Sequence, residues 1–187
     1  MVGLTSKKRV AVVKCDSYDY KNVKNAVEKG ISLVGGLDSF VVKGKKALLK
    51  PNILAGDHPD KCTTTHPSVL KAVAELLIEK GITVSYGDSP GFGDPLSTAK
   101  AAHFDEVARE LNIKFADFIN AKEVSYKDGV LVKKFYIANA VIDTDAIISL
   151  PKLKTHQFER ITAAIKNQFG CIPGVRKAEY HVRFPDA

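Results

Sequence analysis

Basic side chains gather in one short part of the sequence, directly after an apolar run. The stretch from 148 to 174 reads ISLPKLKTHQFERITAAIKNQFGCIPG. Between Leu150 and Lys177 there are six Lys or Arg residues and one acid, a net charge of +5 out of +7 for the whole chain. Lys and Arg bind carboxylate and phosphate groups through charge-assisted hydrogen bonds. A charge this local favours an anion site over a generally basic surface.

Three of these basic residues occupy alternate positions. Lys152, Lys154 and His156 would face the same way in an extended segment, because side chains alternate along a strand. We expect the two lysines to bind the anion and His156 to act as a general acid or base. The alternative for a charge run is a solvated face. The apolar neighbours Leu150 and Leu153 instead indicate a backbone that is held against the protein.

Helical character follows over residues 161–169, and this segment includes Lys166 and Asn167. We assign both side chains to ligand binding. If the helix begins near Thr162, its positive end would strengthen the field beside the lysines. The whole segment therefore predicts a site for a carboxylate or a phosphate.

Two earlier loops also place polar side chains directly after apolar runs. The loop KPNILAGDHPDKCTTTHP, residues 50–67, offers Lys50 and Asn52 as ligand-binding groups. The loop GDSPGFGDP, residues 87–95, offers Asp88 as a catalytic group and Ser89 as a ligand-binding hydroxyl. This second loop is neither a Walker A motif nor GxGxxG. An ordinary Gly/Pro turn, in which Asp88 bonds its own backbone, is the alternative.

The first loop also contains candidate metal ligands. His58, Cys62 and His66 lie four residues apart and have metal-compatible side chains. Their spacing matches no strong zinc or iron–sulfur pattern, so a surface loop with a free thiol is the alternative. His66 has a further interpretation as the N-cap of a helix that begins at Pro67, where backbone N–H groups and the helix dipole attract an anion.

These loops connect strands and helices that alternate along the chain. Such alternation favours an α/β fold, with a mainly parallel sheet, helices on both faces and a β-hairpin excursion. In such sheets ligands bind beyond the carboxyl ends of the strands. The expected strands are 10–13, 45–51, 82–86 and 145–150, the expected helices are 23–34, 67–80 and 97–111 (capped by Ser97), and the hairpin spans 124–137.

Length and composition limit the class of protein. A chain of 187 residues is expected to form one domain, 1–187. No apolar run reaches the roughly 20 residues that span a bilayer, and none near the N-terminus suits a signal peptide, so we expect a cytoplasmic protein without membrane contact. The three separated cysteines do not form a disulfide framework. Nucleic-acid binding is not favoured, because no known DNA-binding motif or aromatic interleaving accompanies the basic segment.

Read together, the motifs resemble the DUF362 domain family over residues 46–184. They are KPNIL, THP, GDSPGFG, SLPKLKTH, AIKNQFGCIPG and the Tyr180-His181 pair, and LPKLKTH followed by KNQFG is the specific part. The resemblance implies an α/β domain and a site built from the lysines, Asn52, Asp88, Ser89, His156 and Asn167 within these motifs. Many members of this prokaryotic family carry a separate ferredoxin-like segment that binds [4Fe–4S] clusters. This chain has no such cysteine-rich motif, and a truncated form of a longer domain is one expectation.

Two functions therefore remain open. The first is an enzyme or enzyme core that binds a small anionic ligand at a site lined by Lys and His. The second is a redox or iron–sulfur-associated module whose cluster segment is missing or supplied by a partner. A redox partner and a second copy of the chain are the other partners left open. The reaction, the substrate and the cofactor are not determined by the sequence.

Overall fold

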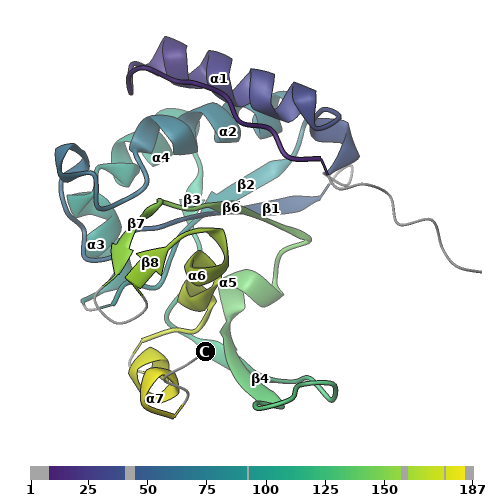
Figure 1. Cartoon of the computed structure of the whole chain (residues 1–187), viewed down its shortest axis with the longest axis vertical. Helices are drawn as coiled ribbons and strands as arrows, with labels where there is room; N and C mark the ends of the chain where they lie inside the picture. Colours follow the sequence, from purple (N-terminus) through teal and green to yellow (C-terminus); the bar gives the residue numbers. More distant parts are fainter. Residues whose placement is uncertain (1–8, 41–44, 92, 157–159, 175, 184–187) are drawn as a thin grey trace, which may run out of the picture.

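A four-stranded parallel sheet forms the centre of the protein, in the order β3-β2-β1-β6 (Figure 1). The computed structural model describes residues 9–40, 45–91, 93–156, 160–174 and 176–183. The strands of the sheet are β1 (Lys46–Pro51), β2 (Thr83–Tyr86), β3 (Lys114–Phe115) and β6 (Ala146–Leu150). Strand β1 lies between β2 and β6 and pairs with both in parallel.

Helices cover the sheet on both sides (Figure 1). On one side lie α1 (Tyr20–Leu33), α2 (Pro67–Glu79), α3 (Pro95–Ala101) and α4 (Phe104–Leu111). On the other side lie α5 (Asn139–Ile142) and α6 (Ala164–Asn167). The α/β fold predicted from the alternation of strands and helices is therefore confirmed.

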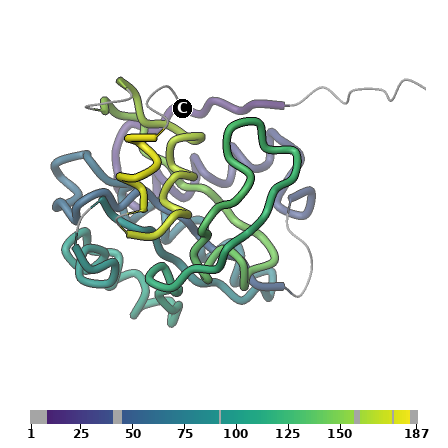
Figure 2. The backbone as a smooth tube through the Cα atoms, turned by 90° about the horizontal axis from the view of Figure 1, so that it is seen from below, coloured from purple at the N-terminus to yellow at the C-terminus, as the bar shows by residue number. Residues whose placement is uncertain are grey.

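The remaining elements are short. They are two antiparallel hairpins, β4 (Ala121–Ser125) with β5 (Lys134–Ala138) and β7 (Lys154–His156) with β8 (Arg160–Thr162), a C-terminal helix α7 (Arg176–Arg183), and three 3-10 turns, η1 (Leu37–Ser39), η2 (Pro59–Lys61) and η3 (Gln168–Cys171). The β4–β5 hairpin was expected from the sequence. It lies beside α7 beneath the sheet (Figure 2).

Strand β1 is buried on both faces, which is usual for the central strand of a parallel sheet. Ala47 and Leu49 join the larger core beneath α2, and Leu48 joins a smaller cluster on the opposite face with Phe118. Helix α2 presents a stripe of apolar residues to the larger core, as its 3.6-residue period predicts. Strand β1 is therefore packed on both faces. Its carboxyl end can hold the side chains of a site in defined positions.

The order of the strands reverses beside β1. The chain builds β1, β2 and β3 outward in one direction and then returns to place β6 on the other side of β1. The loops that leave β1 and β6 therefore separate at their carboxyl ends, and open α/β sheets bind ligands at such a point. Among the described residues, no helix is long and apolar enough to cross a membrane.

Two sequence expectations were wrong. Residues 10–13 form no strand, and Val10 and Val12 are 87% and 90% exposed, since this run has no neighbouring edge with which to pair within the described part of the chain. The single helix expected over 97–111 is two helices, α3 and α4, separated at His103, which has a left-handed backbone with φ of 62°. The break lets both Ala102 and Phe104 reach full burial in the core.

The cap of α3 also differs from the expectation. Asp94 precedes the helix, and its side chain accepts a hydrogen bond from the backbone N–H of Ser97 at 2.8 Å. Asp94→Ala should therefore lower the free energy of unfolding by about 1 kcal/mol, because it leaves that N–H without its cap. Ser97→Ala should change it by less than about 0.5 kcal/mol. Urea unfolding of both variants measures the difference, and the reverse order would restore Ser97 as the cap.

Candidate functional site

A buried ion pair lies where β1 ends. Lys50 is 0% exposed and Asp88, just beyond β2, is 3% exposed. The Lys50 Nζ lies 2.6 Å from Asp88 Oδ1, and Asp88 Oδ2 accepts a hydrogen bond from the backbone N–H of Ile53 at 3.0 Å. Both oxygens of the carboxylate therefore have partners, and the pair joins the loops that follow β1 and β2.

Asn167 ties this pair to the end of β6. Its Nδ2 donates to the Lys50 carbonyl oxygen and to the Ser149 hydroxyl, both at 3.0 Å, and its Oδ1 lies 3.4 Å from Lys50 Nζ. Asn167 is 2% exposed. The structure thus brings together side chains from all three loops that the sequence placed beyond strand ends.

A second lysine lies beside this cluster without a carboxylate of its own. Lys154 Nζ donates to Asn52 Oδ1 at 2.7 Å and to the Thr63 carbonyl oxygen at 2.5 Å. Burial lowers the pKa of Lys154 to about 8, the charge of Lys152 acts in the same direction, and Asp88 and Asp57 oppose it. Asp57 is engaged elsewhere, by Lys61 and Thr63.

Two buried hydroxyl groups near Lys154 have no hydrogen-bond partner within the part of the chain that the structure describes. Thr162 lies opposite Lys154 in the β7–β8 hairpin, where paired residues share a face. Thr64 follows the residue whose carbonyl Lys154 contacts. Thr162 and Thr64 are 2% and 1% exposed, and the side-chain oxygen of each lacks a partner among the described residues. Partnerless buried hydroxyls are uncommon and cost free energy, so a bound ligand is a physical reason for them.

Ser89 contacts a lysine to which sequence reasoning gave no role. Lys177, on α7, donates to Ser89 Oγ at 2.6 Å and to the carbonyl oxygens of Ser89 and Ile172, both at 3.1 Å. Burial lowers the pKa of Lys177 to about 8, Asp88 opposes this effect, and Lys50 and Lys166 add to it. The sequence feature that could have pointed to Lys177 is the high density of Lys and Arg in the C-terminal segment.

Aromatic and basic groups form the outer edge of the site. The Tyr18 ring stacks on His66 with centroids 4.2 Å apart, and the Tyr18 hydroxyl accepts a hydrogen bond from Lys152 Nζ at 2.9 Å. His66 is the N-cap of α2, and its Nδ1 accepts from the backbone N–H of Ser68. Burial lowers the pKa of His66, and Lys152 adds to the effect. No pattern in the sequence pointed to Tyr18.

His156 and Lys166 gather around His181 of α7 rather than around Lys50. Lys166 Nζ lies 3.1 Å from His181 Nε2, and the rings of His156 and His181 have centroids 6.2 Å apart. The helix expected to begin near Thr162 begins instead at Ala164, because Thr162 ends β8, and α6 has only four residues before η3 follows it. The dipole of so short a helix adds little to the field.

The three candidate metal ligands are in different surroundings. His58 packs edge-on against His103, Cys62 is exposed with a left-handed backbone, and His66 stacks on Tyr18. Among the described residues no three His, Cys, Asp or Glu side chains gather as a metal site requires. The metal hypothesis stays a prediction, without geometric support from these residues.

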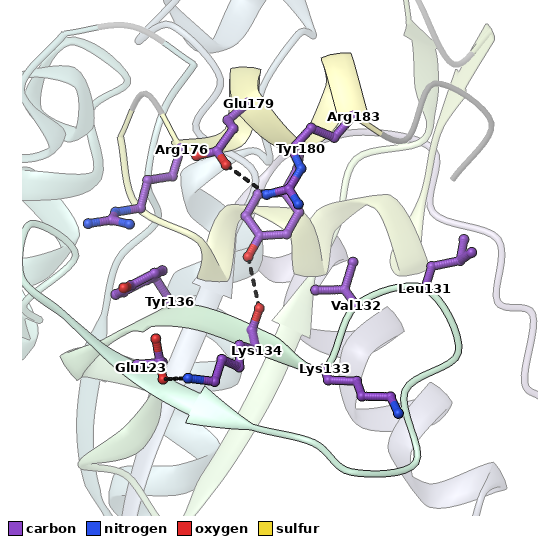
Figure 3. Close-up of a pocket in the computed structure, with 10 residues that line it drawn as sticks. All are labelled: Glu123, Leu131, Val132, Lys133, Lys134, Tyr136, Arg176, Glu179, Tyr180 and Arg183. Carbon is purple, nitrogen blue, oxygen red and sulfur yellow. Dashed lines mark hydrogen bonds and ion pairs between the residues drawn. The ribbon is translucent and has the colours of Figure 1, made fainter.

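Two cavities lie near α7. A cavity of about 250 Å³ is bordered by Ser89 and Gly174 and by the Gly/Pro loop after β2. A larger one of about 420 Å³ lies between α7 and the β4–β5 hairpin (Figure 3). In the larger cavity the guanidinium of Arg176 lies over the Tyr136 ring at 3.7 Å, and the acids Glu123 and Glu179 are paired with Lys134 and Arg183.

Comparisons with known proteins agree with the motifs. The chain is 33% identical over 175 residues to the thylakoid-associated protein sll1697 of Synechocystis, an alignment covering 94% of this chain and 54% of that relative. It thus spans about half the length of the curated relative it matches. No solved structure is detectably similar. Residues 47–187 match the model of a domain of unknown function, DUF362. The chain therefore belongs to the DUF362 family.

Proposed function

We propose that the cluster around Lys154 binds a small oxyanion, a carboxylate or a phosphate, and that this domain is an enzyme core acting on it. The observation that supports this most is the environment of the Lys154 ammonium. Its contacts are neutral oxygens of Asn52 and Thr63, and two partnerless buried hydroxyls, those of Thr64 and Thr162, belong to the surrounding segments. An oxyanion would supply both the missing charge and the missing hydrogen-bond acceptors.

The charge balance of the cluster supports the same proposal. Lys50 and Lys154 bring two ammonium groups, and Asp88 brings one carboxylate, which Lys50 and the Ile53 backbone already occupy. Near a strand-order reversal, uncompensated positive charge in a partly buried place attracts an anion strongly. In this proposal Lys50, Asn52, Asn167 and Asp88 orient the groups that touch the ligand.

The catalytic roles remain part of the proposal. His156 follows Lys154 on the same face of β7, so it would transfer a proton to or from a ligand held by that lysine. Lys152 and Lys166 would extend the basic surface on either side. The substrate and the reaction are open, because neither the family description nor the name of the relative states a reaction.

Replacing Lys154 should abolish the anion's stabilising effect. In a panel of carboxylates, phosphates and nucleotides, a ligand at 100 times its dissociation constant should stabilise the protein by about 2.7 kcal/mol. Lys154→Met should remove this gain, because the ammonium is the charge that the anion needs. Lys114→Met, at an exposed position of β3, is the matched control and should keep the stabilisation by the ligand. Thermal unfolding with and without each ligand makes the measurement.

The same binding should weaken as the pH rises. The pKa of Lys154 is about 8 in the unliganded protein, and a bound anion favours the charged form. The affinity for the anion is therefore highest below pH 8, and it should fall by up to about tenfold per pH unit above pH 8. No stabilisation by any member of the panel, or equal stabilisation of Lys154→Met and the parent protein, would remove the proposal.

We infer that the protein works in the cytoplasm, as the sequence predicts. The relative's name associates that protein with thylakoids. Cell fractionation with an antibody against the chain tests this, and recovery in the membrane pellet after a salt wash would contradict it.

A further inference from the structure

Ser89 and Lys177 form a contact that the anion site does not use. Ser89 Oγ lies 2.6 Å from Lys177 Nζ, and it also accepts a hydrogen bond from the backbone N–H of Gly174 at 3.0 Å. Ser89 is 5% exposed. The serine belongs to the loop after β2, and the lysine comes from α7, separated from it by 88 residues of sequence. Folding therefore places a hydroxyl and an amine in hydrogen-bond contact behind the Gly/Pro loop.

The other two contacts of Lys177 determine how its amine points. Both are to backbone carbonyl oxygens, of Ser89 and Ile172, at 3.1 Å. A carbonyl oxygen can only accept, so these contacts use two N–H bonds of the amine. In the neutral amine the remaining tetrahedral position is a lone pair, and the third contact is the Ser89 hydroxyl. Two carbonyls therefore aim the lone pair of Lys177 at the Ser89 proton.

A cavity of about 250 Å³ opens in front of the serine. Ser89 and Gly174 form part of its wall, with Pro90, Gly91, Phe118 and Ile119 among the other lining residues. Lys177 does not line this cavity, so a ligand there would meet Ser89 and not the amine. The wall is mostly apolar side chains and glycine backbone, which suits a short acyl or alkyl group.

We propose that Ser89 is a nucleophile with Lys177 as its general base, and that the pair acts on a small acyl ester held in this cavity. Ser89 Oγ bonds to the acyl carbon while its proton passes to Lys177 Nζ. The bond from that carbon to the leaving alcohol oxygen then breaks, and Lys177 gives its proton to that oxygen. Water attacks the acyl-serine, Lys177 takes a proton from it and returns one to Ser89 Oγ, and the free acid leaves.

The charges around Lys177 are compatible with a base near neutral pH. Burial, Lys50 and Lys166 favour the neutral amine, and Asp88 favours the charged one, with a resulting pKa of about 8. A lysine on the surface would be neutral in a far smaller fraction of molecules at the same pH. This proposal is independent of the anion site, because Lys154 has no part in it.

Labelling by an alkyl fluorophosphonate tests the pair. Ser89 Oγ would displace fluoride from phosphorus, and intact mass with peptide mapping would locate one adduct on Ser89. Lys177→Arg keeps a charged hydrogen-bond donor at the position but removes the base, so it should slow labelling by about 100-fold. The rate for the parent protein should rise about tenfold per pH unit up to pH 8 and then level off.

Matched controls separate this result from general reactivity. Ser89→Ala should remove the adduct, whereas Ser97→Ala, at an exposed serine of α3, should keep it. Absence of a Ser89 adduct in the parent protein from pH 7 to 9.5 overturns the proposal. So does a Lys177→Arg variant that is labelled at the parent rate. A variant that melts below the assay temperature leaves the pH profile of the parent protein to decide.

Discussion

Lys50→Met should lower the free energy of unfolding by roughly 3–5 kcal/mol, the largest effect expected for one side chain here. The substitution keeps most of the apolar stem and removes the ammonium that lies 2.6 Å from Asp88 Oδ1. Asp88 then remains 3% exposed with a charge that no other described ammonium contacts directly. Urea or guanidinium unfolding, with the slope compared to the parent protein, measures the loss.

Two further variants test whether the unpaired charge is the cause. Lys50→Met combined with Asp88→Asn removes the buried charge but keeps an acceptor for the Ile53 backbone N–H, so it should be more stable than Lys50→Met alone. Lys122→Met breaks an ion pair with Asp143 whose side chains are 58% and 62% exposed, and it should cost less than about 0.5 kcal/mol. Equal losses for Lys50→Met and Lys122→Met would show that the buried ion pair contributes no more to stability than an exposed one.

Gly170→Ala should also lower the free energy of unfolding substantially. A methyl group on Gly170 would lie 2.1 Å from Asp88 Oδ1 and 2.7 Å from Lys50 Nζ. The buried pair has no free space on that side, so either the ion pair separates or the η3 turn moves. We expect a loss of about 1–3 kcal/mol from overpacking. We also expect weaker anion binding, because η3 directly follows Asn167 and the α6 segment.

Gly91→Ala is the matched control for that substitution. A methyl group at Gly91 meets no atom within 4 Å, and the residue is exposed. The change should be neutral or stabilising by up to about 1 kcal/mol, through the smaller conformational freedom of the unfolded chain. A Gly170→Ala protein as stable as Gly91→Ala would mean that η3 can move away from the ion pair without cost.

Local sequence patterns located most elements of this fold. Helix α2 begins at Pro67 and ends before Gly81, as proline at the first turn and glycine beyond the last turn predict. Strand β1 ends at Pro51, and β6 ends at Leu150 before a proline. These signals work because a proline or an apolar period acts over a few residues, whatever the rest of the chain does.

The wrong expectations share one physical origin. Residues 10–13 have the composition of a strand, but a strand also needs an edge to pair with. The segment 97–111 has the period of one helix, but burial of Ala102 and Phe104 required a break at His103. The helix expected to begin near Thr162 begins at Ala164, because the pairing of β8 with β7 keeps residues 160–162 extended. In each case the presence or absence of contacts with distant residues decided the outcome over local preference.

The sequence by itself determined the family, the alternation of strands and helices, and the placing of Lys50, Asn52, Asp88 and Asn167 at or beyond the carboxyl ends of strands. Only the tertiary structure decided which groups became partners. Lys50 reaches Asn167 across 117 residues of sequence, and Lys177 reaches Ser89 across 88. The physical reason is that a strand or helix signal depends on neighbouring residues, whereas hydrogen-bond partners depend on where the packed sheet brings its loops. The contacts that Lys177 and Tyr18 make therefore became visible only in the folded chain.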